Sequence, residues 1–307
     1  MQIGMIGLGK MGSGLISRLV SDNHEVVAFD TDPKIVGKIN EKNVIITNNL
    51  DKFIKKLKNI STNNNLIIWV MVPSGKPTED TLNSLKNIVS QGDIIIDGGN
   101  SYYKDSIRRY KMFKSLKIHF LDVGTSGGIW GAQNGYCLMI GGEKTPYKKA
   151  KPIFKSLSSN DQKAETFLVG PSGSGHFVKM IHNGIEYGMM QSLAEGFELL
   201  KAKKEFNYDL PLVAQIWKHG SVVRSWLLDL TKIALKNDPD LKTLSPYVED
   251  SGEGRWTIKE AIDLGVPAPS ITASIFTRFA SREKHSFSLK ILAALRQQFG
   301  GHSVKNQ

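Results

Sequence analysis

Residues 2–12, Gln-Ile-Gly-Met-Ile-Gly-Leu-Gly-Lys-Met-Gly, decide the fold of the first half of this chain. Residues 2–7 form a short apolar run that ends in glycine and predicts a strand, and residues 10–22 follow with the apolar spacing of a helix. Between them, Gly7, Gly9 and Gly12 match the pattern G-x-G-x-x-G. Directly after a strand and at the start of a helix, this pattern predicts a dinucleotide-binding turn, with a glycine-rich turn of another α/β protein as the alternative.

Each glycine of the turn has its own predicted role, and an acidic residue follows at the expected distance. Gly7 permits the tight turn, Gly9 lets a pyrophosphate reach the N–H groups at the helix start, and Gly12 lets the helix pack closely on the strand. Asp30 ends the second predicted strand, about 20 residues further on, where a carboxylate binds the ribose hydroxyls of NAD. Because Asp30 would repel the 2′-phosphate of NADP, NAD is the predicted cofactor and NADP the less favoured one.

The periodicity of the chain changes near residue 165. Before it, apolar strand-like runs alternate with helical stretches, which predicts a mostly parallel sheet wrapped by helices. After it, strand signals nearly vanish and helical periodicity recurs, beginning with one long helix over 174–204. We therefore predict an α/β Rossmann-type dinucleotide-binding domain over residues 1–165, followed by an all-α C-terminal domain over residues 166–307. The predicted strands are 2–7, 25–29, 66–72, 93–97, 117–123 and 136–140, and the predicted helices between them are 10–22, 33–42, 48–58, 78–90 and 103–115.

The composition limits the function classes. No apolar run reaches the roughly 18 residues of a membrane helix and no signal peptide is recognisable, so no membrane partner is expected. A single cysteine, Cys137, excludes an intrachain disulfide and a cysteine-based zinc site, and it favours a cytoplasmic location. The net charge of +11 suits an anionic ligand. However, the basic residues are spread along the chain without a nucleic-acid-binding motif, so no nucleic-acid partner is expected.

Two predicted strands end in small and polar residues. Gly98, Gly99 and Asn100 follow one of them, and the segment Ser126–Gly128 follows the next. Because ligands bind at the carboxyl ends of strands in open α/β sheets, Asn100 is placed to contact both cofactor and substrate, although a plain Gly-Gly turn is an equal alternative. The predicted cofactor-binding residues are Gly7, Leu8, Gly9, Lys10, Met11, Gly12, Asp30, Met71, Val72, Pro73 and Asn100.

The long predicted helix carries three polar residues on one face. Lys179, Asn183 and Glu186 are separated by four and three residues, and His176 and His182 flank them. The helix is otherwise apolar nearly all round, which is typical of a buried helix. Burial would lower the pKa of the Lys179 amine and let it accept a proton, whereas a structural ion pair with Glu186 is the alternative interpretation.

Together these segments resemble 6-phosphogluconate dehydrogenase, the decarboxylating enzyme of the pentose phosphate pathway. The resemblance covers essentially the whole chain, which is shorter than the long form of the family and looks like its short, typically NAD-using branch. Two alternatives are another β-hydroxyacid dehydrogenase, such as one acting on 3-hydroxyisobutyrate without CO2 release, and a non-enzymatic dinucleotide-binding regulator. The matching segments are 7–12, 97–101, 126–128, 173–187, 254–257, Arg278, Arg296 and 299–302.

The resemblance implies a reaction and a role for each site residue. Lys179 would take the proton from the C3 hydroxyl of 6-phosphogluconate during hydride transfer and would act as an acid while CO2 leaves. Glu186 would then protonate C1 of the enediol to give ribulose 5-phosphate. No metal is expected, because the keto group is the electron sink. The implied substrate-binding residues are Asn100, Ser126, Gly127, Gly128, His182, Asn183, Tyr187, Arg278, Arg296 and His302.

The resemblance also implies self-association, and the chain departs from the family in two places. In the family, the C-terminal Arg and His reach into the neighbouring subunit's site, so Arg296 and His302 imply a homodimer or tetramer. The segment Ser251–Glu253 stands where the long form has a Lys and a Thr for the phosphate. Because an acid near a phosphate is unfavourable, this loop is expected to differ from that of the long form or to point away from the phosphate. Pro73 removes one N–H donor from the nucleotide loop.

Overall fold

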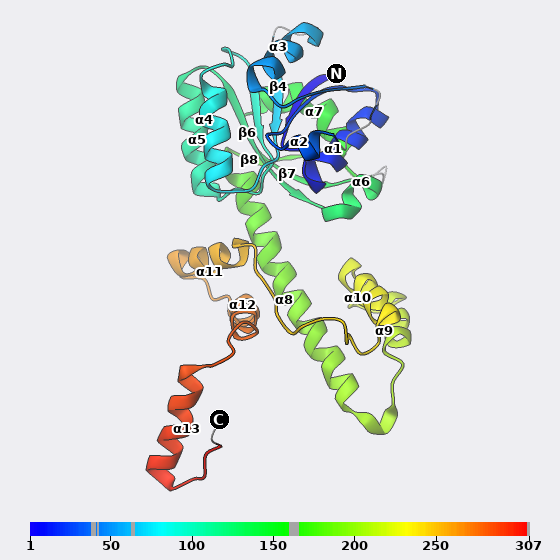
Figure 1. The fold of residues 1–307 in the computed structure, drawn as a ribbon, viewed down its shortest axis with the longest axis vertical. Helices are drawn as coiled ribbons and strands as arrows, with labels where there is room; N and C mark the ends of the chain where they lie inside the picture. Colours follow the sequence, from blue (N-terminus) through cyan, green and yellow to red (C-terminus); the bar gives the residue numbers. More distant parts are fainter. Residues whose placement is uncertain (38–40, 42, 63–64, 160–165, 306–307) are drawn as a thin grey trace. The chain divides into compact units, whose positions relative to one another are not determined.

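The computed structural model describes residues 1–37, 41, 43–62, 65–159 and 166–305. They form two compact units, Met1–His182 and Asn183–Gln307 (Figure 1). The predicted domain boundary after residue 165 adjoins residues 160–165, which lie outside the described residues. The predicted helix over 33–42 also extends onto residues outside the description, and its described part is α2 (Pro33–Val36).

The first unit is built around one sheet, which has eight strands in the described part of the chain. The strand order is β3-β2-β1-β4-β5-β6-β7-β8, and neighbouring strands are parallel except for β6 and β7. The first six strands have the order of a Rossmann fold, so the predicted α/β fold is confirmed. The strands are β1 (Gln2–Ile6), β2 (Glu25–Phe29), β3 (Val44–Thr47), β4 (Ile67–Val70), β5 (Ile94–Asp97), β6 (His119–Ser126), β7 (Cys137–Gly142) and β8 (Leu168–Gly170).

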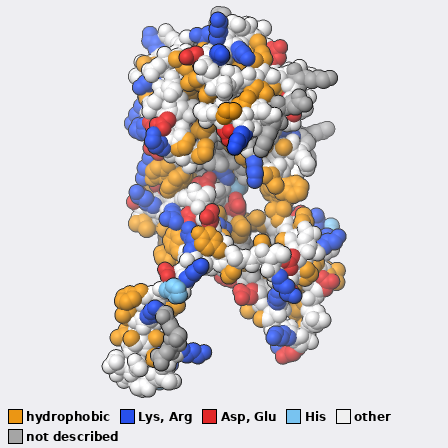
Figure 2. Space-filling model, viewed as in Figure 1, with side chains coloured by type: hydrophobic (Ala, Val, Ile, Leu, Met, Phe, Trp, Pro, Cys, Tyr) orange, Lys and Arg blue, Asp and Glu red, His pale blue; other side chains and the backbone are white. Residues whose placement is uncertain are grey.

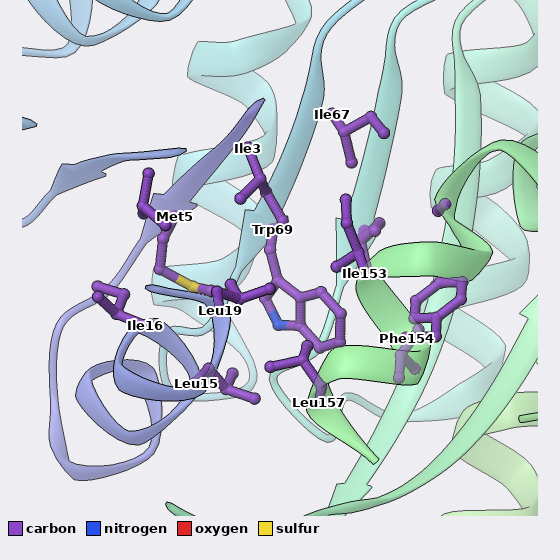
Figure 3. Close-up of a cluster of buried hydrophobic side chains, with 14 of the residues drawn as sticks. Ile3, Met5, Leu15, Ile16, Leu19, Ile67, Trp69, Ile153, Phe154 and Leu157 are labelled. Carbon is purple, nitrogen blue, oxygen red and sulfur yellow. The ribbon is translucent and has the colours of Figure 1, made fainter. Parts of the chain in front are cut away.

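Helices cover both faces of this sheet, and Figure 1 shows α4 and α5 side by side on one of them. The other face is covered by α1 and α7, whose side chains pack around Trp69 (Figure 3). The strands β3 and β8, the helices α6 and α7 and the turn η1 go beyond the elements listed from the sequence. The helices of this unit are α1 (Lys10–Ser21), α3 (Leu50–Ile60), α4 (Lys76–Lys86), α5 (Tyr103–Ser115), α6 (Gly131–Asn134) and α7 (Lys144–Leu157), with a short 3-10 turn η1 (Gly128–Trp130).

The two faces of the sheet carry separate apolar cores. Because successive residues of a strand point to opposite faces, β4 sends Ile67 and Trp69 into the core under α1 and α7. Its other two residues, Ile68 and Val70, enter the core under α3, α4 and α5. This burial on both faces explains why the strands read as continuous apolar runs in the sequence.

The second unit is helical, as predicted. Phe197 of α8 packs with residues of the next two helices in a small apolar core. Among the described residues, no helix has both the length and the apolar character needed to cross a membrane. The helices are α8 (Ser174–Ala202), which begins in the first unit, α9 (Leu210–Lys218), α10 (Trp226–Asn237), α11 (Glu253–Leu264), α12 (Pro269–Ala280) and α13 (Phe287–Gly300), with a 3-10 turn η2 (Lys204–Phe206).

The long helix α8 differs from the prediction of a helix buried nearly all round. Val178, Ile185 and Leu199 are exposed in the single chain, whereas Lys179 and Tyr187 are buried. The prediction was wrong because apolar residues on several faces of a helix do not require that one chain cover all of them. The uncovered apolar side chains are available to a second molecule.

Candidate functional site

The turn between β1 and α1 has the geometry that a dinucleotide requires. Gly7 has a φ of +93°, which side-chain-bearing residues rarely adopt, and a Cβ there would collide with the carbonyl oxygen of Met71. A Cβ on Gly12 would collide with the carbonyl oxygen of Gly7, so this glycine lets the helix approach the strand. A Cβ on Gly9 would meet no described atom within 4 Å, which leaves space for a phosphate beside the backbone.

Asp30, directly after β2, holds this turn in place. One carboxylate oxygen accepts a hydrogen bond from the Leu8 N–H at 2.8 Å, and the other accepts one from the Asp32 N–H at 2.9 Å. The N-cap of α1 is Gly9, so no side chain caps the first N–H groups of the helix, which suit a pyrophosphate. The carboxylate keeps lone pairs for ribose hydroxyls. The residues present therefore fit a dinucleotide.

The loop after β4 lies against the same turn. Met71 is in reach of Gly7, as the collision described above shows, and Val72 and Pro73 follow it. The Pro73 carbonyl accepts a hydrogen bond from Thr78 Oγ1 at 2.8 Å, which fixes the loop to α4. Of the remaining predicted cofactor residues, Leu8 is buried, Lys10 is exposed and Met11 is half-buried.

Asn100 ties the ends of β5 and β6 together. Its Oδ1 accepts a hydrogen bond from the Thr125 N–H at 2.8 Å, and its Nδ2 donates one to the Thr125 carbonyl at 3.1 Å. Its φ of +54° lies in the left-handed region, which Asn tolerates better than most residues. The side chain thus holds the start of the Ser126–Gly128 loop, and one Nδ2 proton is left for a ligand.

Lys179 packs on β6 close to that loop. The residue is 5% exposed, and a Cβ on Gly124 would collide with its Cβ and come within 2.9 Å of its Cγ. Burial raises the pKa of the Cys137 thiol, and the nearby Lys179 acts against this rise. Cys137 pairs with Ser126 across β6 and β7. The structure therefore brings Lys179 to the end of the sheet where Ser126 begins the predicted substrate loop.

Asp122 on β6 fixes the start of α8, a role that the sequence reasoning missed. Its buried carboxylate accepts hydrogen bonds from the N–H groups of Gly173 at 2.7 Å and His176 at 3.0 Å, and from the Ser172 hydroxyl at 3.2 Å. His176 is itself buried, and its Nδ1 lies 2.7 Å from Ser106 Oγ. An acidic residue inside an apolar strand was the signal for this contact, because a buried carboxylate needs donors.

A second buried carboxylate, Asp97, ends β5 and was also missed. Its Oδ2 accepts a hydrogen bond from the buried Arg109 at 3.0 Å, and its Oδ1 accepts one from the Gly99 N–H at 3.2 Å. Arg109 also donates to Glu79 at 3.1 Å, and Arg108 binds Glu79 through two hydrogen bonds. Hydrogen bonds from Arg108, and then from Arg109, outweigh the cost of burial and hold the pKa of Glu79 at about 2. The network connects α4 and α5 to the segment that carries Asn100.

In the second unit, two predicted substrate residues, Tyr187 and Arg278, lie together. The guanidinium carbon of Arg278 is 3.6 Å from the centre of the Tyr187 ring, and Arg278 Nη1 donates to the Glu249 carbonyl at 2.8 Å. The Tyr187 hydroxyl is hydrogen-bonded to Ser251, in the loop just before α11. Among the other predicted site residues of this unit, Asn183 is buried, Glu186 is half-buried, and Arg296 and His302 are exposed. His182, in the first unit, is half-buried.

The neighbouring Asp250 was not predicted as a site residue. Its carboxylate forms ion pairs with Arg255 at 2.8 Å and with Arg282 at 2.9 Å. The hydrogen bonds from Arg255 and then from Arg282 outweigh the cost of burial and hold the pKa of Asp250 at about 2. These pairs anchor the loop around Ser251. In the described part of the chain, no group of three or more His, Cys, Asp or Glu could hold a metal ion.

A Rossmann sheet with a glycine turn, an acid after β2 and a following helical unit defines an NAD(P)-dependent oxidoreductase. Solved 3-hydroxyisobutyrate dehydrogenases share this fold at 16–18% identity, with TM-scores of 0.71 and 0.73. The family is shown by two models: the NAD binding domain of 6-phosphogluconate dehydrogenase matches residues 2–170, and the 6-phosphogluconate dehydrogenase C-terminal domain matches residues 175–306. The chain belongs to the 6-phosphogluconate dehydrogenase family.

Individual relatives support this membership. The Bacillus subtilis protein YqeC is 42% identical over the full length of both chains, and the NAD(+)-dependent decarboxylating 6-phosphogluconate dehydrogenase of Haloferax volcanii is 38% identical over 99% of this chain and 98% of its own. The solved 6-phosphogluconate dehydrogenase of Plasmodium falciparum has a TM-score of 0.83 at 27% identity, over all of this chain and 66% of that one. The expected family is confirmed.

The comparisons also bear on the cofactor. The first unit matches an NAD-binding domain, and relatives named NAD(+)-dependent occur at 38% and 35% identity. A relative named NADP(+)-dependent occurs at 38% identity over 92% of this chain and 62% of its own. The expected cofactor class is confirmed, and the family match favours an enzyme over a non-catalytic regulator.

Proposed function

We propose that this protein oxidises and decarboxylates 6-phosphogluconate to ribulose 5-phosphate and CO2, with NAD as the preferred hydride acceptor. The observation that carries the proposal is the buried Lys179, packed against Gly124 of β6 at the sheet end that also holds Ser126. A lysine in this place suits an oxidoreductase that must remove a hydroxyl proton. A simpler hydroxyacid dehydrogenase has in its favour only a likeness of fold.

The residues of the chain divide the proton transfers between them. NAD, when bound, supplies the acceptor for the hydride that leaves C3. Lys179 accepts the proton of the C3 hydroxyl, since burial disfavours its charged form, and it returns a proton to the keto oxygen as the bond to the carboxyl carbon breaks. Glu186 donates the proton that C1 of the enediol needs, while Lys179 takes up the proton that the C2 hydroxyl loses as the ketone of the product forms. The electron pair from the broken bond thus ends in a C–H bond, and the products balance.

The remaining residues would bind the substrate and the cofactor. Gly7, Gly9 and Gly12 would accommodate the pyrophosphate and Asp30 the ribose, in keeping with the open turn described above. Arg278 would bind the phosphate, for which its planar guanidinium is suited. The other proposed substrate-binding residues are Asn100, Ser126, Gly127, Gly128, His182, Asn183, Tyr187, Arg296 and His302.

We also propose that the protein acts as a homodimer or a tetramer in the cytoplasm. The supporting observation is α13, none of whose residues is buried in the single chain, although it carries Phe287, Leu292 and Leu295. Figure 2 shows hydrophobic side chains on the surface of this helix. A helix with this much exposed apolar surface is typical of an interface. Packing of α13 against a second copy of the chain would bring Arg296 and His302 to the site of that neighbour.

The test is to incubate the pure protein with NAD and 6-phosphogluconate and to measure NADH and CO2 together. We expect equal amounts of the two products, and NADH without CO2 would contradict the decarboxylation.

Lys179→Met should lower kcat by at least about a thousandfold while NAD still binds, because the proton acceptor is lost. Glu186→Gln should lower kcat more than it raises KM. Asp30→Ala should reduce the preference for NAD over NADP.

A further inference from the structure

The loop at Ser251 contains a chain of hydrogen bonds that ends on Tyr187. The Ser251 hydroxyl donates to the carboxylate of Glu253, a residue that is only 5% exposed. Ser251 Oγ also lies 2.9 Å from the Tyr187 hydroxyl oxygen, and the Ser251 N–H donates to the same oxygen at 3.0 Å. All of these groups belong to the second unit.

The number of protons fixes the direction of this chain. A hydroxyl group has one proton to donate, and an ionised carboxylate only accepts. Because Ser251 donates its proton to Glu253, its oxygen must accept in the contact with Tyr187. The single hydroxyl proton of Tyr187 is therefore committed to Ser251. A phosphate presents acceptor oxygens and needs donors, so Tyr187 has no proton to offer it.

Arg278 is in the opposite situation. Of its five N–H groups, one donates to the Glu249 carbonyl and another lies 3.7 Å from the sulfur of Met190, which is a weak acceptor. Its face is stacked on the Tyr187 ring, and this contact orients the guanidinium plane. The nearby Arg255 and Arg282, by contrast, are paired with Asp250. Arg278 is the arginine of this cluster whose donors remain for an anion.

We infer, on the basis of the proposed function, that Tyr187 is a positioning residue for Arg278 and that Glu253 keeps the tyrosine proton away from the substrate phosphate. Glu253 acts through Ser251, whose proton it accepts. The aromatic ring, and not the hydroxyl, is then what Tyr187 contributes to phosphate binding.

Two substitutions should release the tyrosine proton by different routes. Glu253→Gln places an amide N–H donor beside Ser251, so the chain can reverse its direction. Ser251→Ala removes the acceptor of the Tyr187 proton but leaves the charge of Glu253 in place. We expect each to lower KM for 6-phosphogluconate, by up to about tenfold for one new hydrogen bond to a charged group. A similar decrease of KM in both variants would show that release of the tyrosine proton, and not loss of the Glu253 charge, causes the effect.

The decisive measurement is the effect of Tyr187→Phe in three backgrounds. With Glu253→Gln or Ser251→Ala present, Tyr187→Phe should raise KM about tenfold, because it removes the released proton. In the otherwise unchanged protein it should raise KM by a much smaller factor, about twofold, because the ring remains under Arg278. Gluconate, which has no phosphate, should show none of this coupling. Tyr187→Leu, which loses the ring, should raise KM for 6-phosphogluconate in every background.

Equal effects of Tyr187→Phe in all three backgrounds would overturn the inference, and so would a tenfold effect in the unchanged protein. Turnover of 6-phosphogluconate by the unchanged protein separates this result from a failure of the proposed function. Without any NADH and CO2 from 6-phosphogluconate, the function and the inference fall together. With turnover and equal effects, only the inference falls.

Discussion

At the residue scale, two glycines of one turn are required for different physical reasons. Gly12 has no room for a Cβ because the carbonyl oxygen of Gly7 occupies that space, whereas Gly9 has open space around it. Gly12 serves the packing of α1 on the sheet, and Gly9 leaves room for an approaching ligand. These are the two separate roles that the sequence pattern predicts for Gly12 and Gly9.

This difference gives a matched pair of substitutions. Gly12→Ala should lower the free energy of unfolding by about 3 kcal/mol, since the new methyl group overlaps the backbone. Gly9→Ala should cost less than about 1 kcal/mol, the cost of a poorer N-cap, and should instead raise KM for NAD at least about tenfold. Urea unfolding and initial rates measure the two effects. A large loss of stability in Gly9→Ala would contradict the assignment.

A third glycine, Gly124, controls the position of the proposed catalytic amine. Gly124→Ala would force the Lys179 side chain away from β6, because the new Cβ collides with it. We expect kcat to fall by at least about a hundredfold, in line with the sensitivity of catalysis to small displacements. The affinity for NAD, measured by protein fluorescence, should fall much less, because the glycine turn is separate from Gly124 in the first unit. An unchanged kcat would show that Lys179 does not depend on this contact.

At the scale of elements, α4 and α5 are joined by Glu79. It lies in the first turn of α4 and binds Arg108 and Arg109 of α5. Arg109 continues to the buried Asp97 at the end of β5. The pairing of two helices on the sheet surface therefore reaches the strand end that carries Asn100.

The Glu79 contacts predict a pH dependence of stability. The pKa of Glu79 is about 2 in the folded protein, below its ordinary value of 4.5. The contribution of the ionised Glu79 to the free energy of unfolding is therefore complete above pH 4.5 and is lost as the pH falls toward 2. Glu79→Gln should lower the free energy of unfolding by about 2 kcal/mol at neutral pH. In urea titrations at decreasing pH, the difference between the two proteins should shrink, and a constant difference would exclude the ionic contribution.

At the scale of the whole molecule, the exposed apolar surface of α13 calls for a partner. Leu292 is 57% exposed and Leu295 is 58% exposed, in a helix that contributes no residue to a core of its own chain. Ile185 and Leu199 of α8 are also exposed, at 52% and 73%, although that helix supplies Phe197 to a core. Burial of such side chains between copies would supply free energy at about 25 cal/mol for each Å² of apolar area.

A charge in the middle of α13 should separate the subunits. Leu292→Asp or Leu295→Asp would place a carboxylate in the proposed interface, which costs free energy unless the carboxylate is paired. Light scattering during size exclusion should then show the mass of one chain, and kcat/KM should fall because Arg296 and His302 no longer reach a neighbour. Gln298→Asp, a change of a polar residue on the same helix, is the control. A monomeric unchanged protein would refute self-association.

The sequence by itself determined the Rossmann class, the glycine turn with Asp30, the all-helical second half and the family. These features depend on local rules: strands buried on both faces read as apolar runs, helices repeat every 3.6 residues, and the turn needs glycine at fixed positions. Such signals lie within a few residues of one another and can be read without knowing the fold. The boundaries of short elements such as β3 were less accessible, because four residues carry little periodicity.

Tertiary structure alone decided the contacts that join distant parts of the chain. Asp122 binds the start of α8, Asp97 binds Arg109, and Glu253 orients the hydroxyl of Tyr187 through Ser251, from a position 66 residues further along the chain. It also decided which face of α8 remains uncovered. The physical reason is that a buried polar group must find its partner wherever the folded chain brings one, and sequence separation says nothing about which group that is.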